Sequence, residues 1–205
     1  MHRRPAVLLA AVALAVGLSG CTTEEPTTAA PTTAEATQAV DEQQLPADLT
    51  SALEGFGVDG SDVRAAITGL DQVDQERPLD VQASVRAHEV IFTGASGEVS
   101  MPIPGEEMYV SIAPYVEQTH ECYYHNLSSC QGELVGEDLD VTITSDDGEV
   151  LVDETVTTYD NGFVGFWLPR DIEGTIEVEF DGRSVTAPIA TGPEDPTCVT
   201  TLQLT

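Results

Sequence analysis

The feature that most constrains the fold is a two-residue alternation of apolar and polar residues that begins near Leu79. Val81, Ala83 and Val85 alternate with polar residues, which places apolar side chains on one face of a β-strand. Further strands, separated by turns such as Asp181-Gly182, are expected at residues 90–92, 99–103, 108–112, 141–143, 150–152, 163–169, 176–180, 185–189 and 198–204. The pattern predicts a mainly β domain over residues 79–205, an antiparallel β-sandwich or barrel-like fold with Trp167 in its core.

Residues 46–78 have a helical pattern instead. Asp48 is expected to cap a first short helix and Ser61 a second one. Roughly thirty residues in two short helices cannot form a core of their own. This small helical N-terminal segment should therefore pack on the rest of the chain or on a second copy of itself, so a homodimer is an expectation.

The N-terminus is typical of a targeting segment. Arg3 and Arg4 precede an apolar run over residues 6–18 that is too short to span a bilayer comfortably. The run ends in Leu18-Ser19-Gly20-Cys21, an order that resembles the lipobox of bacterial lipoproteins. It predicts a lipoprotein signal peptide over residues 1–20 and a lipid, with palmitate among its acyl chains, on Cys21. The alternative is an ordinary secretory peptide. Either reading places the protein outside the cytoplasm, and the first holds it on the cell membrane through the lipid anchor only.

Composition adds two constraints. Residues 21–45 are rich in Thr, Pro, Ala and Glu and poor in large apolar side chains, which predicts a disordered tether after the lipidated cysteine. The formal net charge is −29, there is no lysine, and removal of Arg3 and Arg4 with the signal peptide takes the charge to −31. A chain without a basic face is not expected to bind nucleic acid.

Two thiols and two imidazoles lie within eleven residues: His120, Cys122, His125 and Cys130. With Cys21 lipidated, Cys198 is the third remaining thiol, and an odd number of thiols in an exported protein needs an explanation. A metal site could use all three, because thiolate and imidazole bind soft and borderline metals such as Cu(I) and Zn(II). Redox-active thiols are a second interpretation.

Local geometry leaves the ligand set open. An extended segment at residues 120–124 would put His120 and Cys122 on one side, whereas a helical turn would put Cys122 and His125 together. A Cys122–Cys130 or Cys130–Cys198 disulfide that clamps the sandwich is the structural alternative. No phosphate-binding loop or serine nucleophile motif competes with these interpretations.

Four segments carry long and unusual motifs: Met108 to His125, Cys130 to Leu134, Gly162 to Asp171 and Asp195 to Leu204. They resemble the periplasmic copper-binding protein family called CueP, and the resemblance runs from about residue 46 to the end of the chain. The resemblance implies that copper is bound by three cysteines, which fall on Cys122, Cys130 and Cys198 here. A histidine near the first two, His120 or His125, is implied as an auxiliary ligand.

Three hypotheses follow for the function. The first is an envelope protein that binds one Cu(I) per chain and contributes to copper tolerance or buffering; zinc is an alternative metal, and a client protein that receives copper is an open alternative partner. The second is a thiol-based Cu(II) reductase or redox protein, although the chain lacks a Cys-x-x-Cys motif. The third is a β-sandwich binding lipoprotein whose cysteines only form a structural disulfide.

Overall fold

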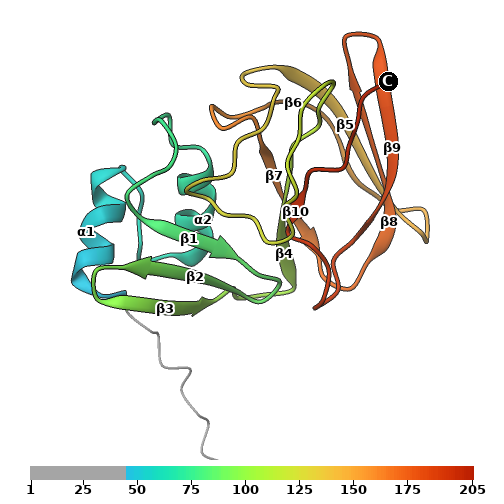
Figure 1. Cartoon of the computed structure of the whole chain (residues 1–205). Coiled ribbons are helices and arrows are strands. Elements are labelled where there is room, and N and C mark those ends of the chain that lie inside the picture. The colour runs from blue at the N-terminus through green and yellow to red at the C-terminus, as the bar shows by residue number, and fades with distance from the viewer. Residues whose placement is uncertain (1–44) are drawn as a thin grey trace, which may run out of the picture. The chain divides into compact units, whose positions relative to one another are not determined.

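Strands make up most of the regular structure in residues 45–205, the part of the chain that this computed structural model describes (Figure 1). Two short helices precede ten strands. Within these residues no helix has the length and apolar character needed to cross a membrane. The predicted signal peptide, the lipid on Cys21 and the tether lie outside the described residues.

The two helices are α1, Ala47–Gly55, and α2, Val63–Asp71. Pro46 rather than Asp48 occupies the N-cap of α1, and the Asp48 carboxylate accepts hydrogen bonds from Ser96 instead. The N-cap of α2 is Asp62, whose side chain accepts from the backbone N–H of Ala65, so the prediction of Ser61 as the cap was wrong by one residue. Both residue types cap helices well, so neighbouring candidates are difficult to separate from sequence.

The helices pack against a small antiparallel sheet and share one core with it (Figure 1). This sheet has the order β1-β2-β3, with β1 at Gln82–Val85, β2 at Glu89–Gly94 and β3 at Gly97–Pro102. Leu49 and Leu53 of α1 and Ile67 and Leu70 of α2 are buried in that core. The apolar faces of both helices are therefore covered within the chain.

A second sheet is buried on both faces. It has the order β10-β4-β7, with β4 at Glu107–Ile112, β7 at Val164–Pro169 and β10 at Cys198–Val199. Tyr109 of β4 belongs to the core under the helices, whereas Met108 and Val110 belong to the core on the other side. Because successive side chains of a strand point to opposite faces, β4 contributes to both cores.

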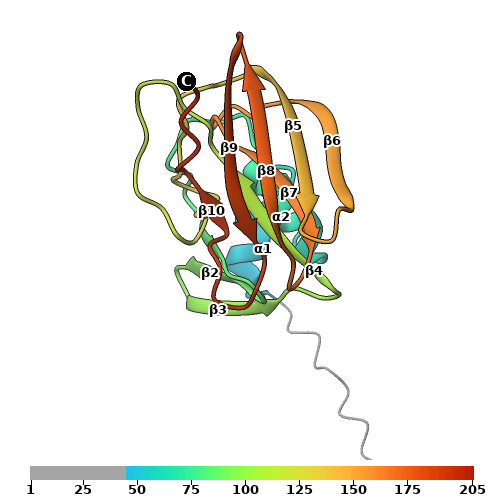
Figure 2. The same cartoon turned by 90° about the vertical axis from the view of Figure 1, so that its right-hand side faces the viewer.

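A four-stranded antiparallel sheet covers the other face of the second sheet, and Figure 2 looks onto it. Its order is β6-β5-β8-β9, with bounds Val150–Thr157, Asp138–Ser145, Glu173–Phe180 and Arg183–Ala190. The prediction of a mainly β, antiparallel sandwich-like fold with a small helical N-terminal segment is confirmed.

Two details of the predicted strands differ. The last strand is only Cys198–Val199, parallel to β4, rather than residues 198–204; beyond it, Gln203 forms a single bridge to Tyr115. Trp167 is half-buried rather than central: it packs at the edge of the first core, with the Arg64 guanidinium 4.0 Å above its ring. Trp167 faces α2 because its neighbours Phe166 and Leu168 point into the second core.

Candidate metal centre

One long connection and one short strand bring the thiols and imidazoles together. The connection, residues 113–137, joins β4 to β5 and carries His120, Cys122, His125 and Cys130. Cys198 is the first residue of β10, and its backbone pairs with Ser111 of β4, directly before this connection. Residues that are far apart in sequence therefore meet at the end of β4.

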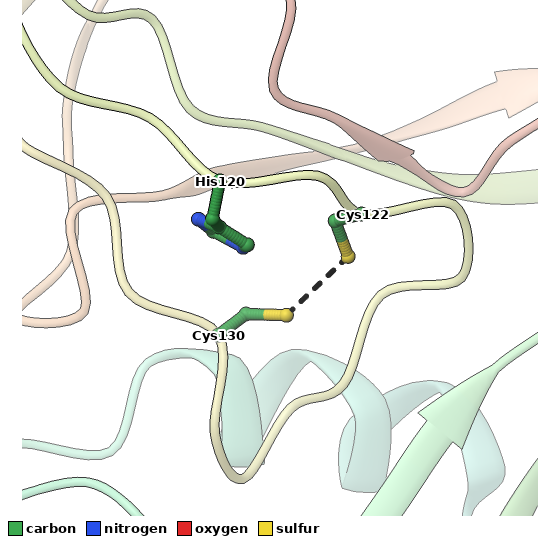
Figure 3. A group of neighbouring side chains, drawn as sticks. All are labelled: His120, Cys122 and Cys130. Atoms are coloured by element: carbon green, nitrogen blue, oxygen red, sulfur yellow. Dashed lines mark hydrogen bonds between the residues drawn. The ribbon is translucent and has the colours of Figure 1, made fainter.

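The donor atoms form two groups that share one sulfur. His120, Cys122 and Cys130 place their donor atoms within 4.8 Å of one another, and so do His125, Cys130 and Cys198. Figure 3 shows the first group, in which the Sγ atoms of Cys122 and Cys130 point toward each other at 3.5 Å. In the second group, Sγ of Cys198 lies 3.7 Å from Nδ1 of His125. Cys130 is common to both groups, and all three cysteines of the described residues are free.

Backbone hydrogen bonds fix the second group in place. The N–H of His125 donates to the hydroxyl of Thr197 at 2.9 Å, and that hydroxyl donates to the carbonyl of Val85 at 2.7 Å. The carbonyl of His125 accepts from the N–H of Val85 at 2.8 Å. The N–H groups of Thr197 and Cys198 both donate to the carbonyl of Tyr123. These bonds tie His125 to Val85 of β1 and to Thr197, the residue before Cys198.

A single carboxylate orders the start of the connection. Glu133 accepts hydrogen bonds from the N–H groups of Val116 at 2.7 Å, Glu117 at 3.0 Å and Gln118 at 3.2 Å. Burial raises the pKa of Glu133, but these three N–H donors outweigh it and lower the pKa. The carboxylate therefore holds the backbone just before His120 in a defined turn.

The His125 ring is completely buried and bonded to a buried carboxylate. Its Nε2 atom lies 2.9 Å from Oδ1 of Asp71, the last residue of α2, and both side chains are 0 % exposed. The same carboxylate accepts from the hydroxyls of Tyr109 at 2.7 Å and Ser111 at 3.0 Å, and from Nδ2 of Asn161 at 2.7 Å. Four donors satisfy the charge, as a buried carboxylate requires.

The electrostatics favour one thiolate beside a cationic ring. Burial disfavours charge on His125, but the Asp71 carboxylate and the Cys130 thiol raise the pKa of the imidazole to about 9. Contacts with Cys122 and Cys198 lower the pKa of Cys130, and the His125 ring lowers it further against the effect of burial. Contact with Cys130 raises the pKa of Cys122 to about 12, and contacts with the other two sulfurs raise the pKa of Cys198. A negative charge on this cluster of sulfur atoms is thus stabilised beside the His125 ring.

The donor set suits a soft metal. Each group offers two sulfurs and one imidazole nitrogen, and neither includes a carboxylate oxygen. Such donors are typical of Cu(I) and Zn(II) sites and unsuited to magnesium or calcium. Nε2 of His120 is buried and, among the described residues, has no hydrogen-bond partner. A buried nitrogen without a partner costs stability unless it binds something, so the residues present fit a thiophilic metal.

Comparison with known proteins identifies the family. The family model described as "Periplasmic copper-binding protein CueP" matches residues 65–203. This chain belongs to the CueP family. A solved structure named "Crystal Structure of S.CueP" is 36% identical, covers 78% of this chain and 99% of its own, and superimposes with a TM-score of 0.72. No match was found among curated proteins.

The family assignment confirms the resemblance seen in the sequence, and this CueP-family chain brings the predicted residues together as described. Of the two local alternatives, His120 and Cys122 share one group, as the extended reading required, although residues 120–122 form no strand. His125 belongs to the group of Cys130 and Cys198, and not to the group that contains Cys122. Which of these side chains bind metal stays a prediction.

Sequence reasoning missed Asp71 as part of the centre. It stands at the start of an acidic, polar run that ends at Glu76, and charged residues of this kind are mostly exposed. One signal was available, because Asp71 lies four residues after Ile67 and therefore falls on the buried face of α2. A carboxylate at a position where the pattern calls for an apolar residue indicates a buried polar partner. The partner, His125, could not be named from that pattern.

Proposed function

We propose that this protein is an extracytoplasmic copper-binding protein that binds one Cu(I) through Cys122, Cys130 and Cys198 and contributes to copper tolerance or buffering. The observation that carries the proposal is that three free thiols converge on Cys130, in a chain whose family is described as periplasmic and copper-binding. Thiolate sulfur is the preferred ligand of Cu(I), and oxygen donors do not compete with it.

The shared position of Cys130 suggests how the three thiols would act. A thiolate in this cluster, favoured by the neighbouring His125 ring, gives an incoming ion a charged sulfur donor. Cys122 belongs to one group and Cys198 to the other, and the remaining thiols lose their protons when the metal binds. His120 and His125 are the auxiliary donors in these two groups.

Anaerobic titration with Cu(I) against a competing chelator tests this proposal, with free thiols counted before and after. We expect one Cu(I) per chain, protection of the three thiols from alkylation, and sulfur as the main scatterer in copper K-edge absorption. His88, which belongs to neither group, provides the matched control: His88→Ala should bind Cu(I) like the wild type. A mature protein with one disulfide and no Cu(I) affinity would support the structural-disulfide alternative instead. Parallel titration with Zn(II) separates the two metals.

Reduction of Cu(II) is a second candidate, and the 3.5 Å separation between Sγ of Cys122 and Sγ of Cys130 favours it. Two Cu(II) ions would each accept one electron from the two thiols, giving two Cu(I) ions, one Cys122–Cys130 disulfide and two protons. Addition of Cu(II) to the reduced protein under argon should then produce Cu(I) and remove two thiols per chain. Cu(II) that stays oxidised while all three thiols persist would exclude this activity.

The remaining proposals concern location and partners. We propose a lipoprotein signal peptide at residues 1–20, a lipid on Cys21 with a tether to residue 45, a helical region at 46–78 and a β-rich metal-binding domain at 79–205. Membrane fractionation tests the anchor: Cys21→Ser should release the protein, and a fully soluble wild type would contradict the lipid anchor.

A homodimer and a client protein that receives copper stay predictions. Sedimentation and copper transfer assays test them.

A further inference from the structure

Asp71 occupies a position that the fold alone does not explain. It is the last residue of α2, and a negative charge at a helix C-terminus opposes the helix dipole. Its carboxylate is also 0 % exposed, and burial of a carboxylate costs stability unless donors surround it. An apolar residue would continue the buried face of α2 at no such cost. The side chains around Asp71 therefore need to be considered together.

The hydrogen bonds around Asp71 determine which nitrogen of His125 carries a proton. Oδ1 accepts from Nδ2 of Asn161, and Oδ2 accepts from the hydroxyls of Tyr109 and Ser111. A carboxylate with these three donors is ionised and can only accept, so Nε2 of His125, 2.9 Å from Oδ1, must be an N–H donor. The other ring nitrogen, Nδ1, then points toward Sγ of Cys198 at 3.7 Å, and the proton that it carries in the cationic ring leaves when a metal binds there.

We propose that Asp71 is a positioning residue of the copper site, which holds His125 with Nε2 protonated and Nδ1 directed at Cys130 and Cys198 as a metal donor. This inference rests on the proposed function and adds to it the identity of the histidine, the ligating nitrogen and the residue that orients it. Carboxylate partners of metal-binding histidines act in this way in general, by fixing the tautomer and the orientation of the ring.

The surroundings of His125 support this assignment. Its ring packs against Phe163 with a centroid distance of 4.6 Å, and its backbone is bonded on both sides, so Nδ1 has little freedom to turn away. Ser111 donates to Asp71 and also pairs with Cys198 through the backbone, which connects the carboxylate and the thiol through one residue of β4. Asp71 thus joins helix α2 directly to the metal centre.

A double-mutant cycle tests the proposal through the affinity for Cu(I). His125→Gln keeps an amide that can donate to Asp71 and removes the nitrogen that faces Cys198. We expect Asp71→Asn and His125→Gln each to weaken Cu(I) binding by about 10- to 100-fold. The double variant should bind no more weakly than His125→Gln alone, because both changes remove the same donor.

A second cycle serves as the control. Asp71→Asn combined with His120→Gln should show independent losses of Cu(I) affinity, so that the two fold-changes multiply. Wild-type affinity in Asp71→Asn, or multiplied losses with His125→Gln, would overturn the role of Asp71.

A matched variant separates positioning from simple destabilisation. Leu53→Ala removes apolar contacts from the core that the helices share with the first sheet and leaves Asp71, its donors and its bond to His125 in place. It should lower the stability of the fold while retaining Cu(I) affinity within a few-fold of the wild type. An equal loss of affinity in Leu53→Ala and Asp71→Asn would show that Asp71 acts only through stability.

Spectroscopy of the wild type keeps the proposal testable if Asp71→Asn fails to fold. In protein labelled with ¹⁵N at histidine and loaded with Cu(I), the His125 ring should retain a proton on Nε2 and show the metal-induced shift at Nδ1. The opposite assignment, or a His125 ring unaffected by Cu(I), would overturn the proposal. Wild-type protein with no affinity for Cu(I) would overturn the proposed function together with this one, whereas wild-type affinity in Asp71→Asn overturns the role of Asp71 alone.

Discussion

Cys198 of β10 lies opposite Ser111 of β4 in a parallel register, and this pairing brings the C-terminal thiol to the loop that holds the other two. Only two residues of β10 pair with β4, but the N–H groups of Thr197 and Cys198 add bonds to the carbonyl of Tyr123. The position of Cys198 is therefore determined by backbone bonds, and its thiol can be replaced without removing them.

The first prediction is an order of effects among the cysteines. Cys130→Ser should weaken Cu(I) binding most, because Cys130 belongs to both groups, whereas Cys122→Ser and Cys198→Ser should each cost orders of magnitude but less. A serine hydroxyl is a hard, protonated donor and a poor ligand for Cu(I). Chelator competition under argon measures all three variants. If Cys198→Ser binds as tightly as the wild type while Cys122→Ser does not, the three-thiol site is wrong, and a local site around Cys122 and Cys130 remains.

A second prediction concerns stability. Because the donors come from distant segments, Cu(I) should bind the folded chain far better than the unfolded one and raise its melting temperature. With free Cu(I) held at a hundred times the dissociation constant, the gain is about 2.7 kcal/mol. Calorimetry with buffered Cu(I) measures it, and Cys130→Ser serves as the variant that should show no such rise. An unchanged melting temperature in the wild type would contradict specific binding to the native state.

Glu133 provides a prediction about pH. Its three backbone donors lower the pKa of the carboxylate, so its stabilising contribution is present above the pKa it has when unfolded, near 4.3, and is lost as the pH falls through the lower folded value. Glu133→Gln should therefore be less stable than the wild type at pH 7, and the difference should shrink below about pH 4. Urea unfolding at several pH values tests this. A difference that stays constant with pH would show that the charge plays no part.

The loop held by Glu133 leads to His120 and Cys122, which gives the same variant a second measurable consequence. Glu133→Gln should weaken Cu(I) binding by a small factor, because the hydrogen bonds to residues 116–118 order the backbone before His120. Glu137→Gln is a suitable control on the same connection, since its side chain takes no part in the hydrogen bonds that order residues 116–118. Equal affinities in both variants would show that the loop is ordered without the Glu133 carboxylate.

Trp167 provides a prediction about the contact between α2 and the central sheet. Its Nε1 donates to the hydroxyl of Thr68 at 3.2 Å, and its ring lies under Arg64. Full burial would make Trp167→Ala cost about 3–5 kcal/mol; because the side chain is half-buried, we expect about 2 kcal/mol. Thr68→Val should cost about 1 kcal/mol, because it removes only the hydrogen bond. Urea unfolding followed by circular dichroism measures both. A cost below about 0.5 kcal/mol for Trp167→Ala would contradict this contact, since changes of that size are typical of open surface.

Residue pattern by itself determined the class of fold and the kinds of donor atom that the centre offers. The two-residue alternation after Leu79 requires strands, since a helix would scatter those apolar side chains over its whole surface. The helical spacing in residues 46–78 was equally informative, and both helices lie where it put them. The thiols and imidazoles concentrated near residue 120 favoured a soft metal over a hard one whatever the fold, because ligand preference is a property of the side chains, while a disulfide and redox-active thiols stayed open. The family was also readable from the sequence and was confirmed by the family model.

Only the tertiary structure decided how these donors are arranged. Spacing along the chain could not say whether His120 or His125 lies beside Cys122, because the connection follows neither a helix nor a strand there. Cys198 reaches the centre through a two-residue parallel pairing, which is too short to leave a pattern in the sequence. Asp71 is the clearest case. A charged residue is mostly exposed, but His125, Tyr109, Ser111 and Asn161, all distant in sequence, supply the donors that make burial of this carboxylate tolerable. Local sequence specifies which donors a segment offers, whereas the partners that satisfy them come from elsewhere in the folded chain.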